Sequence, residues 1–278
     1  MEDRAAFIDV ATEHLPSNLA GQWISLLRPA LTLEASAKGK IAGQLGGEPL
    51  LPVDAPWPSW PGHGPLTFIA GLDCAMLRGT DLELPDSGSL LFFYFDGQVD
   101  GDQAFVNGRL PETSAAAQVL YLDQDAKVES RSHPEGLQPY SRVPLHARTV
   151  WSAPDEDSPA LADTFDLDDP ETARQLADDA FVDALAPWDK PLHQVGGYPA
   201  ETQGAPEYEV GVGRHPELDS ESPAFIEVSR EWQLLLQISE DDEAEMHWGD
   251  TGTLYWFIRA EDLRLRRFDR AAFTWQSG

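Results

Sequence analysis

The amino-acid sequence predicts a mainly β (α+β) protein, with a roll-like fold of two duplicated β-rich halves and peripheral helices. The first observation is a set of short runs of branched and aromatic residues that follow glycine turns, which is typical of buried strands. The second is an order that occurs twice: a Gly-Gly-x-Pro turn, an apolar strand and a Gly-x-Leu-aromatic strand. The two copies are residues 46–49, 66–72 and 88–94, and residues 196–199, 232–238 and 252–258. Because their spacings differ by loop insertions, the pattern favours a degenerate duplication over a repeat array, with chance similarity of buried strands as the alternative.

Length and charge limit the classes of function. The chain has 278 residues, 42% of them apolar, which suffices for one domain or two tightly packed halves with a sizeable core. It carries 19 Lys and Arg residues against 48 Asp and Glu residues, a formal net charge of -29. Such a charge repels nucleic acid and anionic membranes and favours basic partners. A solvated acidic surface without a partner is the alternative.

Cysteine usage and the N-terminal residues bear on the compartment. Cys74 is the only cysteine, which excludes an intrachain disulfide and a cysteine-based zinc cage and fits a reducing cytoplasm. Residues 1–5 lack a basic region before a long apolar run, and no apolar run is long enough to cross a bilayer. We therefore expect a cytoplasmic protein.

The N-terminal segment, residues 1–34, is expected to form helices and a first strand packed on the body. Apolar residues recur at helical spacing over residues 3–14. Pro16 ends that helix, and Ser17 is suited to cap a second one. Residues 31–33 are then expected to form a short strand.

The first β-rich half is expected over residues 35–152. From residue 38 to residue 65 the chain is dense in glycine and proline, yet Trp57 and Trp60 predict an ordered irregular loop. Four strands are expected after it, at residues 66–72, 89–95, 118–122 and 146–151.

An acidic insert separates the two halves. Residues 153–190 carry twelve acidic residues against Arg174 and Lys190. Asp169 suits a helix N-cap and Pro170 the first turn, before an apolar helix face that extends to Leu185. The segment lacks the Asp-x-Asp-x-Asp-Gly spacing of a calcium loop, so a charged loop and a solvated helix face are favoured. The second β-rich half is expected over residues 191–278.

Several motifs together resemble the YwqG-like bacterial family, domain of unknown function 1963. They cover the chain from about residue 30 to its end: residues 40–52, 57–58, 65–69, 88–94, 193–199, 235–238 and 248–252. The resemblance implies a mainly β, roll-like fold and no established activity. Gly71 stands where the family has a glutamine that Gln237 keeps, so a site shared by that pair would lack its first-half copy. The acidic stretch 153–168 is a second departure.

Standard catalytic signatures are absent. The chain has no Gly-x-Ser-x-Gly elbow, no His-Glu-x-x-His and no Cys-x-x-Cys, and Cys74 is expected to be a small core residue. We therefore predict no catalytic residue, no metal site and no cofactor. The candidate binding residues gather at the glycine turns and the aromatic segments: Lys40, Gly46, Gly47, Trp60, His193, Gly196, Gly197, Tyr198, Gln237, Trp248 and Asp250.

Each main candidate has a structural alternative. His193 precedes a glycine pair that lets backbone amides approach another group, so it would bind a ligand, accept a proton or hydrogen-bond the loop to the body. His247 and Asp250 are close enough in sequence for an acid–base pair, although Asp250 also suits an Asx turn. Trp57 and Trp60 would suit a proline-rich ligand, a sugar ring or the core, and we expect Trp60 to be the more exposed.

The leading hypothesis is a non-catalytic, cytoplasmic binding module with a basic protein as partner. An inhibitor or immunity-type protein that covers a basic patch on a toxin is one such module. The alternative is a small-molecule sensor or enzyme with a cleft between the halves, formed by Lys40, His193, Gln237 and Asp250. A structural domain without a ligand is a third hypothesis. In both hypotheses that include a ligand or partner, we expect the turns at Gly46 and Gly196 to face each other.

Overall fold

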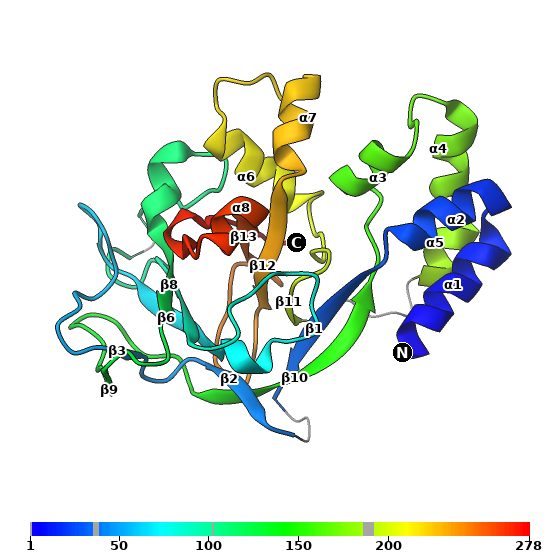
Figure 1. Cartoon of the computed structure of the whole chain (residues 1–278). Helices are drawn as coiled ribbons and strands as arrows, with labels where there is room; N and C mark the ends of the chain where they lie inside the picture. The colour runs from blue at the N-terminus through cyan, green and yellow to red at the C-terminus, as the bar shows by residue number, and fades with distance from the viewer. Residues whose placement is uncertain (1, 36–38, 102, 186–191) are drawn as a thin grey trace.

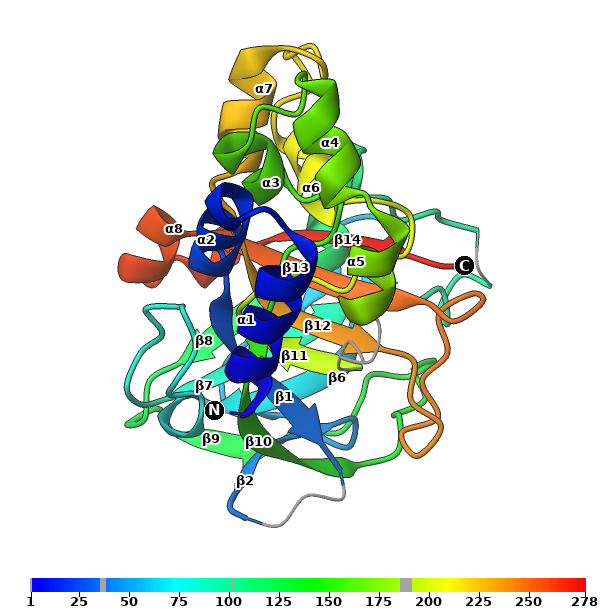
Figure 2. The same cartoon turned by 90° about the vertical axis from the view of Figure 1, so that its right-hand side faces the viewer.

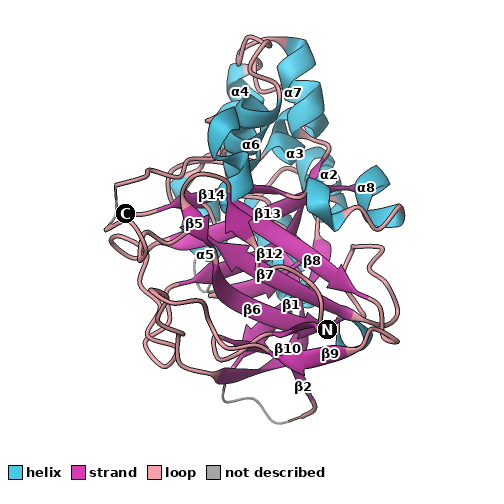
Figure 3. Cartoon of the chain, turned by 90° about the vertical axis from the view of Figure 1, so that its left-hand side faces the viewer, coloured by secondary structure: helices cyan, strands magenta, loops and turns pink. Residues whose placement is uncertain are grey.

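One large antiparallel sheet organises the protein. The computed structural model describes residues 2–35, 39–101, 103–185 and 192–278. In that part of the chain the sheet has ten strands, in the order β14-β13-β12-β11-β1-β10-β2-β6-β7-β8 (Figures 1 and 3). The predicted mainly β (α+β) class is confirmed.

The strands of the large sheet are β1 (Arg28–Glu34), β2 (Ile41–Leu45), β6 (Thr67–Asp73), β7 (Ser89–Tyr94), β8 (Ala117–Leu122), β10 (Val143–Ser152), β11 (His193–Val195), β12 (Trp232–Ser239), β13 (Thr253–Arg259) and β14 (Ala272–Gln276). Two small ladders lie outside it: β3 (Leu50–Pro52) with β9 (Val128–Ser130), and β4 (Ser59–Trp60) with β5 (Gly64–Pro65).

A central pair of strands joins two arms of the sheet. In β1 and β10, Arg28 lies opposite Ser152 and Glu34 lies opposite His146. The first arm, β2-β6-β7-β8, extends from β10, and the second arm, β11-β12-β13-β14, extends from β1. The first strand of each arm therefore pairs with the central strand that does not precede it in the sequence: β2 pairs with β10 and not β1, and β11 pairs with β1 and not β10.

The two arms share one pattern of strand pairing. Gln44 lies opposite Gly71 in the first arm, and Gln194 lies opposite Gln237 in the second. A register shift follows Phe68 in the first arm, and another follows Leu234 at the matching place in the second. The registers make these pairs of positions correspond: Gln44 and Gln194, Gly71 and Gln237, Leu91 and Tyr255, Leu122 and Gln276.

The main core lies between the arms, because the sheet curls until they meet. The Tyr94 ring on β7 stacks on Phe273 of β14 with 4.8 Å between the ring centroids. Phe92 meets Trp256 edge-on at 5.4 Å. These contacts belong to one apolar cluster that runs through both arms and the central pair. The same curl gives the sheet an outer face, on which both grooves described below lie.

The helices pack outside this curl. They are α1 (Glu2–His14), α2 (Ser17–Ser25), α3 (Pro159–Thr164), α4 (Pro170–Leu176), α5 (Asp179–Leu185), α6 (Pro206–Arg214), α7 (Pro223–Ser229) and α8 (Ala260–Arg264). The first five share one apolar cluster, in which Trp23 meets Phe181 at 5.3 Å and Phe7 at 6.2 Å. Figure 2 shows α1, α2 and α5 in front of the large sheet. None of the described helices is long and apolar enough to cross a membrane.

Some predicted elements differ from those observed. The loop expected over residues 38–65 contains β2, whose residues Ala42 and Leu45 are fully buried. The predicted N-cap at Asp169 is confirmed, since its side chain accepts a hydrogen bond from the Thr172 amide. That helix stops at α4, however, and a new one begins where the Asp178 carboxylate accepts from the Ala180 amide. Residues 186–190 of the predicted insert lie outside the described residues.

Helices α3, α6 and α7 lie where none is predicted. Each begins at a proline, which the first turn of a helix tolerates because its missing N–H has no helical partner. Ser158 and Ser222 cap α3 and α7 through their hydroxyls. The pairs Ser158-Pro159 and Ser222-Pro223 therefore mark the starts of these two helices in the sequence.

Candidate functional site

A groove of about 890 Å³ lies between helices α1 and α5 and the outer face of strands β1, β10 and β11. We call it the acidic groove. Among the described residues that line it, the basic side chains are Arg148 and His193. Carboxylates are far more numerous: Asp3, Glu34, Asp155, Glu240, Asp241, Asp242 and Glu243. The groove therefore suits a cationic ligand.

Some of these carboxylates already have partners. The Arg148 guanidinium lies 2.8 Å from a Glu34 oxygen. His193 Nε2 lies 3.1 Å from Asp241 Oδ2, and this hydrogen bond holds the pKa of Asp241 below its usual value. The other Asp241 oxygen accepts a hydrogen bond from the Ala244 amide at 2.7 Å.

Three acidic side chains remain for a ligand. Within the described chain, no hydrogen bond or ion pair engages the carboxylates of Asp3, Asp242 and Glu243. Asp3 stands on α1, whereas Asp242 and Glu243 follow β12, so the free charges lie on separate segments of the wall. A cation in the groove would be drawn to more than one of them.

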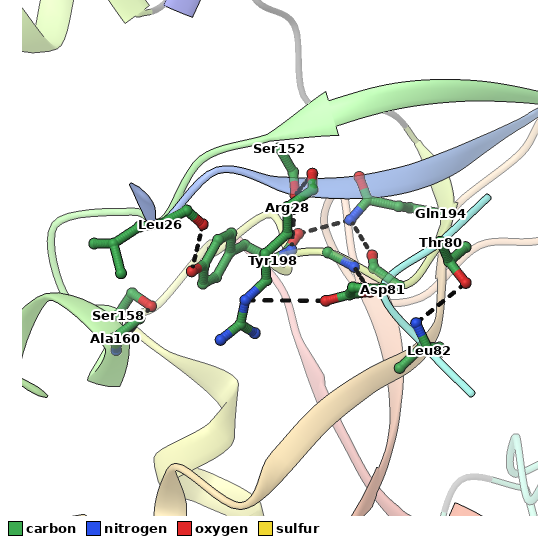
Figure 4. Close-up of polar contacts among 12 residues, drawn as sticks. Leu26, Arg28, Thr80, Asp81, Leu82, Ser152, Ser158, Ala160, Gln194 and Tyr198 are labelled. Carbon is green, nitrogen blue, oxygen red and sulfur yellow. Dashed lines mark hydrogen bonds and ion pairs between the residues drawn. The ribbon is translucent and has the colours of Figure 1, made fainter. Parts of the chain in front are cut away.

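The second glycine turn is fixed by the protein itself (Figure 4). The Gly197 amide donates to the Asp81 carboxylate at 3.0 Å. The Tyr198 hydroxyl donates to the Leu26 carbonyl at 2.9 Å, and the Arg28 guanidinium lies 4.5 Å over its ring. Burial raises the pKa of Tyr198 to about 12. The turn thus anchors the wall of the groove with contacts that are already complete.

The first glycine turn is also held by hydrogen bonds within the protein, but to backbone carbonyls and at the opposite end of the strands. The Gly46 amide donates to the Ile69 carbonyl at 2.9 Å and the Gly47 amide to the Tyr140 carbonyl at 2.8 Å. Strands β1 and β10 lie between β11 and β2, and each neighbouring pair is antiparallel. Strands β2 and β11 therefore run in opposite directions, and their C-terminal ends lie at opposite ends of the sheet's strands. The expectation that Gly46 and Gly196 face each other is therefore wrong.

After the second turn, residues 198–204 cross the outer face of the second arm. Side chains from its four strands hold the backbone of this covering segment. Gln194 donates to the Tyr198 carbonyl at 2.7 Å, and Gln237 accepts from the Ala200 amide at 2.8 Å. Tyr255 donates to the Ala200 carbonyl at 2.6 Å. Gln276 accepts from the amides of residues 202 and 203 and donates to the carbonyl of residue 204.

Few of the predicted binding residues line the acidic groove: His193 and Tyr198 do, both buried. Trp60 is 7% exposed, because its ring stacks on His63 at 3.7 Å. The half-buried Trp57 is the more accessible of the two, so the predicted order of exposure is wrong.

The remaining candidates are dispersed. Trp248 is buried against Tyr94 and Tyr140, whereas Lys40 and Asp250 are exposed outside the groove. The residues proposed for a cleft between the halves therefore do not converge. Among the described residues, no hydrogen bond or ion pair joins His247 to Asp250, the acid–base alternative, and His247 Nδ1 lies 4.0 Å from a Glu240 oxygen.

Sequence reasoning missed most of the groove. The acidic run from Glu240 to Glu243 was visible as a signal, but only the fold shows that Asp3 and Asp155 join it. Within the described ranges, no three metal-binding side chains gather to hold an ion.

Comparison with known proteins gives a family. The model of the family described as "Domain of unknown function (DUF1963)" matches residues 43–277. No curated protein matches the chain.

Proposed function

Since the chain belongs to the family of domain of unknown function 1963, whose description assigns no activity, we propose a function from the acidic groove. The protein is a non-catalytic binding module, and the groove holds a basic segment of a partner protein. The observation that carries this proposal is the excess of carboxylates over basic groups in a groove of about 890 Å³.

The form of the groove supports a polypeptide as the ligand. Its volume falls within the roughly 300–1,000 Å³ of small-molecule sites, but its charges stand on separate segments, which suits an extended ligand with several cations. Apolar surface from the half-buried Leu185 and from Leu192, 62% exposed, lies beside the acids, so it can also receive the aliphatic stems of lysine and arginine. An inhibitor or immunity-type protein that masks a basic patch would use such a groove.

The net charge of -29 supports the same proposal through association kinetics. A strongly negative protein attracts a basic partner over a distance comparable to the Debye length, which raises the association rate at low salt. Binding should therefore weaken as salt is added.

Fluorescence anisotropy with a labelled peptide of alternating lysine and glycine tests the proposal, with a glutamate–glycine peptide as control. We expect binding of the lysine peptide alone, weakened at least ~10-fold between ~50 mM and ~300 mM NaCl. The double variant Asp242→Asn and Glu243→Gln should weaken binding at low salt, because it removes two unpaired charges from the wall.

A matched variant separates the groove from net charge. Asp166→Asn with Asp168→Asn changes two exposed acids outside the groove, so both double variants move the net charge from -29 to -27. The control variant should bind as the unmodified protein does. Equal losses in the two variants, or no binding of the lysine peptide, would contradict the proposal.

We further propose that the arms arose by duplication of one β unit and that the protein acts in the bacterial cytoplasm. The matching register shifts and a shared hydrogen bond support duplication: Gln44 bonds the Gly46 carbonyl and Gln194 bonds the Gly196 carbonyl, both at 2.8 Å. A reducing compartment is supported by Cys74, the single cysteine, which is buried.

A further inference from the structure

A second groove, of about 290 Å³, lies on the outer face of strands β2, β6 and β7 in the first arm. We call it the apolar groove. Its lining includes Gly71, Phe68 and Leu91 from the strands. At its rim stand Ile41 and Leu50, each 54% exposed. Val128, 38% exposed, joins them, so large apolar side chains that contact water gather around one groove.

This groove occupies the place that the covering segment occupies in the second arm. There, Gln237, Tyr255 and Gln276 bind the backbone of residues 198–204. The corresponding residues of the first arm are Gly71, Leu91 and Leu122, and all three line the apolar groove. None of their side chains can hydrogen-bond a backbone.

The first arm also lacks the segment itself. After its glycine turn, the chain enters β3 and pairs with β9 instead of crossing the strands. Gln44, the one polar residue kept in common with the second arm, is occupied: it donates to the Gly46 carbonyl and accepts from Arg142, each at 2.8 Å. The face that the second arm covers with its own chain is therefore open in the first arm and lined by apolar side chains.

We propose that the apolar groove docks an extended, apolar segment of a partner protein, which crosses the strands of the first arm as residues 198–204 cross those of the second. Because the backbone-binding side chains are replaced by Gly71, Leu91 and Leu122, the groove recognises the side chains of that segment. A volume of about 290 Å³ lies below the roughly 300–1,000 Å³ typical of small-molecule sites and suits one or two apolar side chains.

The charges at the groove define the segment further. Glu48, Asp73 and Asp123 line it against one basic residue, Arg142. Glu48 accepts hydrogen bonds from Ser130 and Ser132, which lower its pKa and keep it ionised. A segment with acidic residues would be repelled, so the partner carries apolar residues flanked by lysine or arginine.

Selection of short random peptides displayed on phage, with the purified full chain as target, tests the proposal. We expect enriched peptides that share apolar residues, have basic flanks and lack acidic residues. One enriched peptide is then synthesised with a fluorophore and measured by anisotropy against the variants that follow.

Two rim substitutions form a matched pair. Leu50→Glu places a charge at the groove and should weaken peptide binding at least ~10-fold. Val53→Glu makes the same change at a residue 52% exposed that does not line the groove, and should leave binding unchanged. Both positions are open to water, so neither variant should impair folding.

A third variant fills the floor of the apolar groove. Gly71→Gln restores the residue of the second arm, and its Cβ would lie 3.1 Å from Leu91 Cδ2 and 3.3 Å from Phe68 Cζ, so these side-chain ends shift slightly. It should weaken peptide binding at least ~10-fold, and thermal unfolding checks that the variant folds.

Three outcomes would overturn the proposal. One is a selection without enriched apolar sequences. Another is a peptide that binds Leu50→Glu as tightly as the unmodified protein. The third is an enriched apolar peptide that loses binding in the variant Asp242→Asn with Glu243→Gln but not in Leu50→Glu, which would place that peptide in the acidic groove.

Discussion

The two arms differ less in their strands than in what covers them. Both have four strands, a matching register shift and a glycine turn after the first strand. In the second arm, polar side chains on the outer face hold residues 198–204, and α6 packs beside that segment. In the first arm, the corresponding residues are glycine and leucine, and the face is a groove. A few outer-face residues therefore decide whether a sheet is covered by its own chain.

The comparison also separates two uses of glycine. Gly47 and Gly197 occupy corresponding turns with φ of 70° and 69°. A Cβ on Gly197 would collide with Ser152 Oγ and lie 2.8 Å from Ala30 Cβ, which cannot move without its strand. On Gly47 it would lie 2.9 Å from Arg142 Cβ, which has to shift slightly, and 3.1 Å or more from the rest of that exposed side chain.

The largest expected effect follows from this difference. Gly197→Ala should lower the free energy of unfolding by about 2–5 kcal/mol, since a left-handed backbone costs an alanine about 1–2 kcal/mol and overpacking adds about 1–3 kcal/mol. Gly47→Ala should cost less, about 1–3 kcal/mol, because it adds to the backbone contribution only the mild contact with Arg142 Cβ. Urea unfolding with an unchanged m value measures both.

A control isolates the backbone contribution. Gly62 has a φ of 86°, and a Cβ there would meet nothing within 4 Å. Gly62→Ala should therefore cost the backbone contribution alone, about 1–2 kcal/mol, and no more than Gly47→Ala. If Gly197→Ala costs no more than these two, the second turn is not tightly packed and the contrast between the arms is wrong.

The strands could be predicted from the sequence, but the segments that cover them could not. Strand runs such as residues 89–95 are legible because buried strands need branched and aromatic residues, and β7 agrees with the prediction. Gly46 and Gly196 lie at opposite ends of the strands because of the pairing between strands distant in the sequence. No local sequence pattern shows that pairing. The acidic groove was missed for the same reason, since Asp3 and Asp242 are far apart in the sequence.

The cover of the second arm also buries an acid, which gives a pH-dependent prediction. Glu207 on α6 is 6% exposed, one of its oxygens has no partner among the described residues, and burial raises its pKa to about 7. The folded state therefore holds the proton more tightly than the unfolded state does. Stability contributed by the neutral acid is present below the unfolded pKa of 4.5 and is lost as pH rises to about 7.

Glu207→Gln should accordingly equal the unmodified protein near pH 4 and exceed it by about 1–3 kcal/mol near pH 8. Chemical denaturation at several pH values measures this difference. Glu227→Gln, an exposed change on α7, is the matched control. A constant difference between the Glu207 variant and the unmodified protein across the pH range would mean that Glu207 is ionised in the fold.

The smallest expected effect concerns the paired glutamines of the outer faces. Gln237 is 1% exposed and accepts a hydrogen bond from the Ala200 amide, so Gln237→Met leaves that half-buried donor unpaired and should cost about 1–2 kcal/mol. Gln44→Met acts at a half-buried position whose Arg142 partner is open to water, and should cost about 0.5–1 kcal/mol. Hydrogen exchange of the Ala200 amide gives a local measure: it should accelerate in the first variant alone. Equal costs and unchanged exchange would show that the covering segment is held by its packing, and the polar contrast between the arms would then not explain why only one of them is covered.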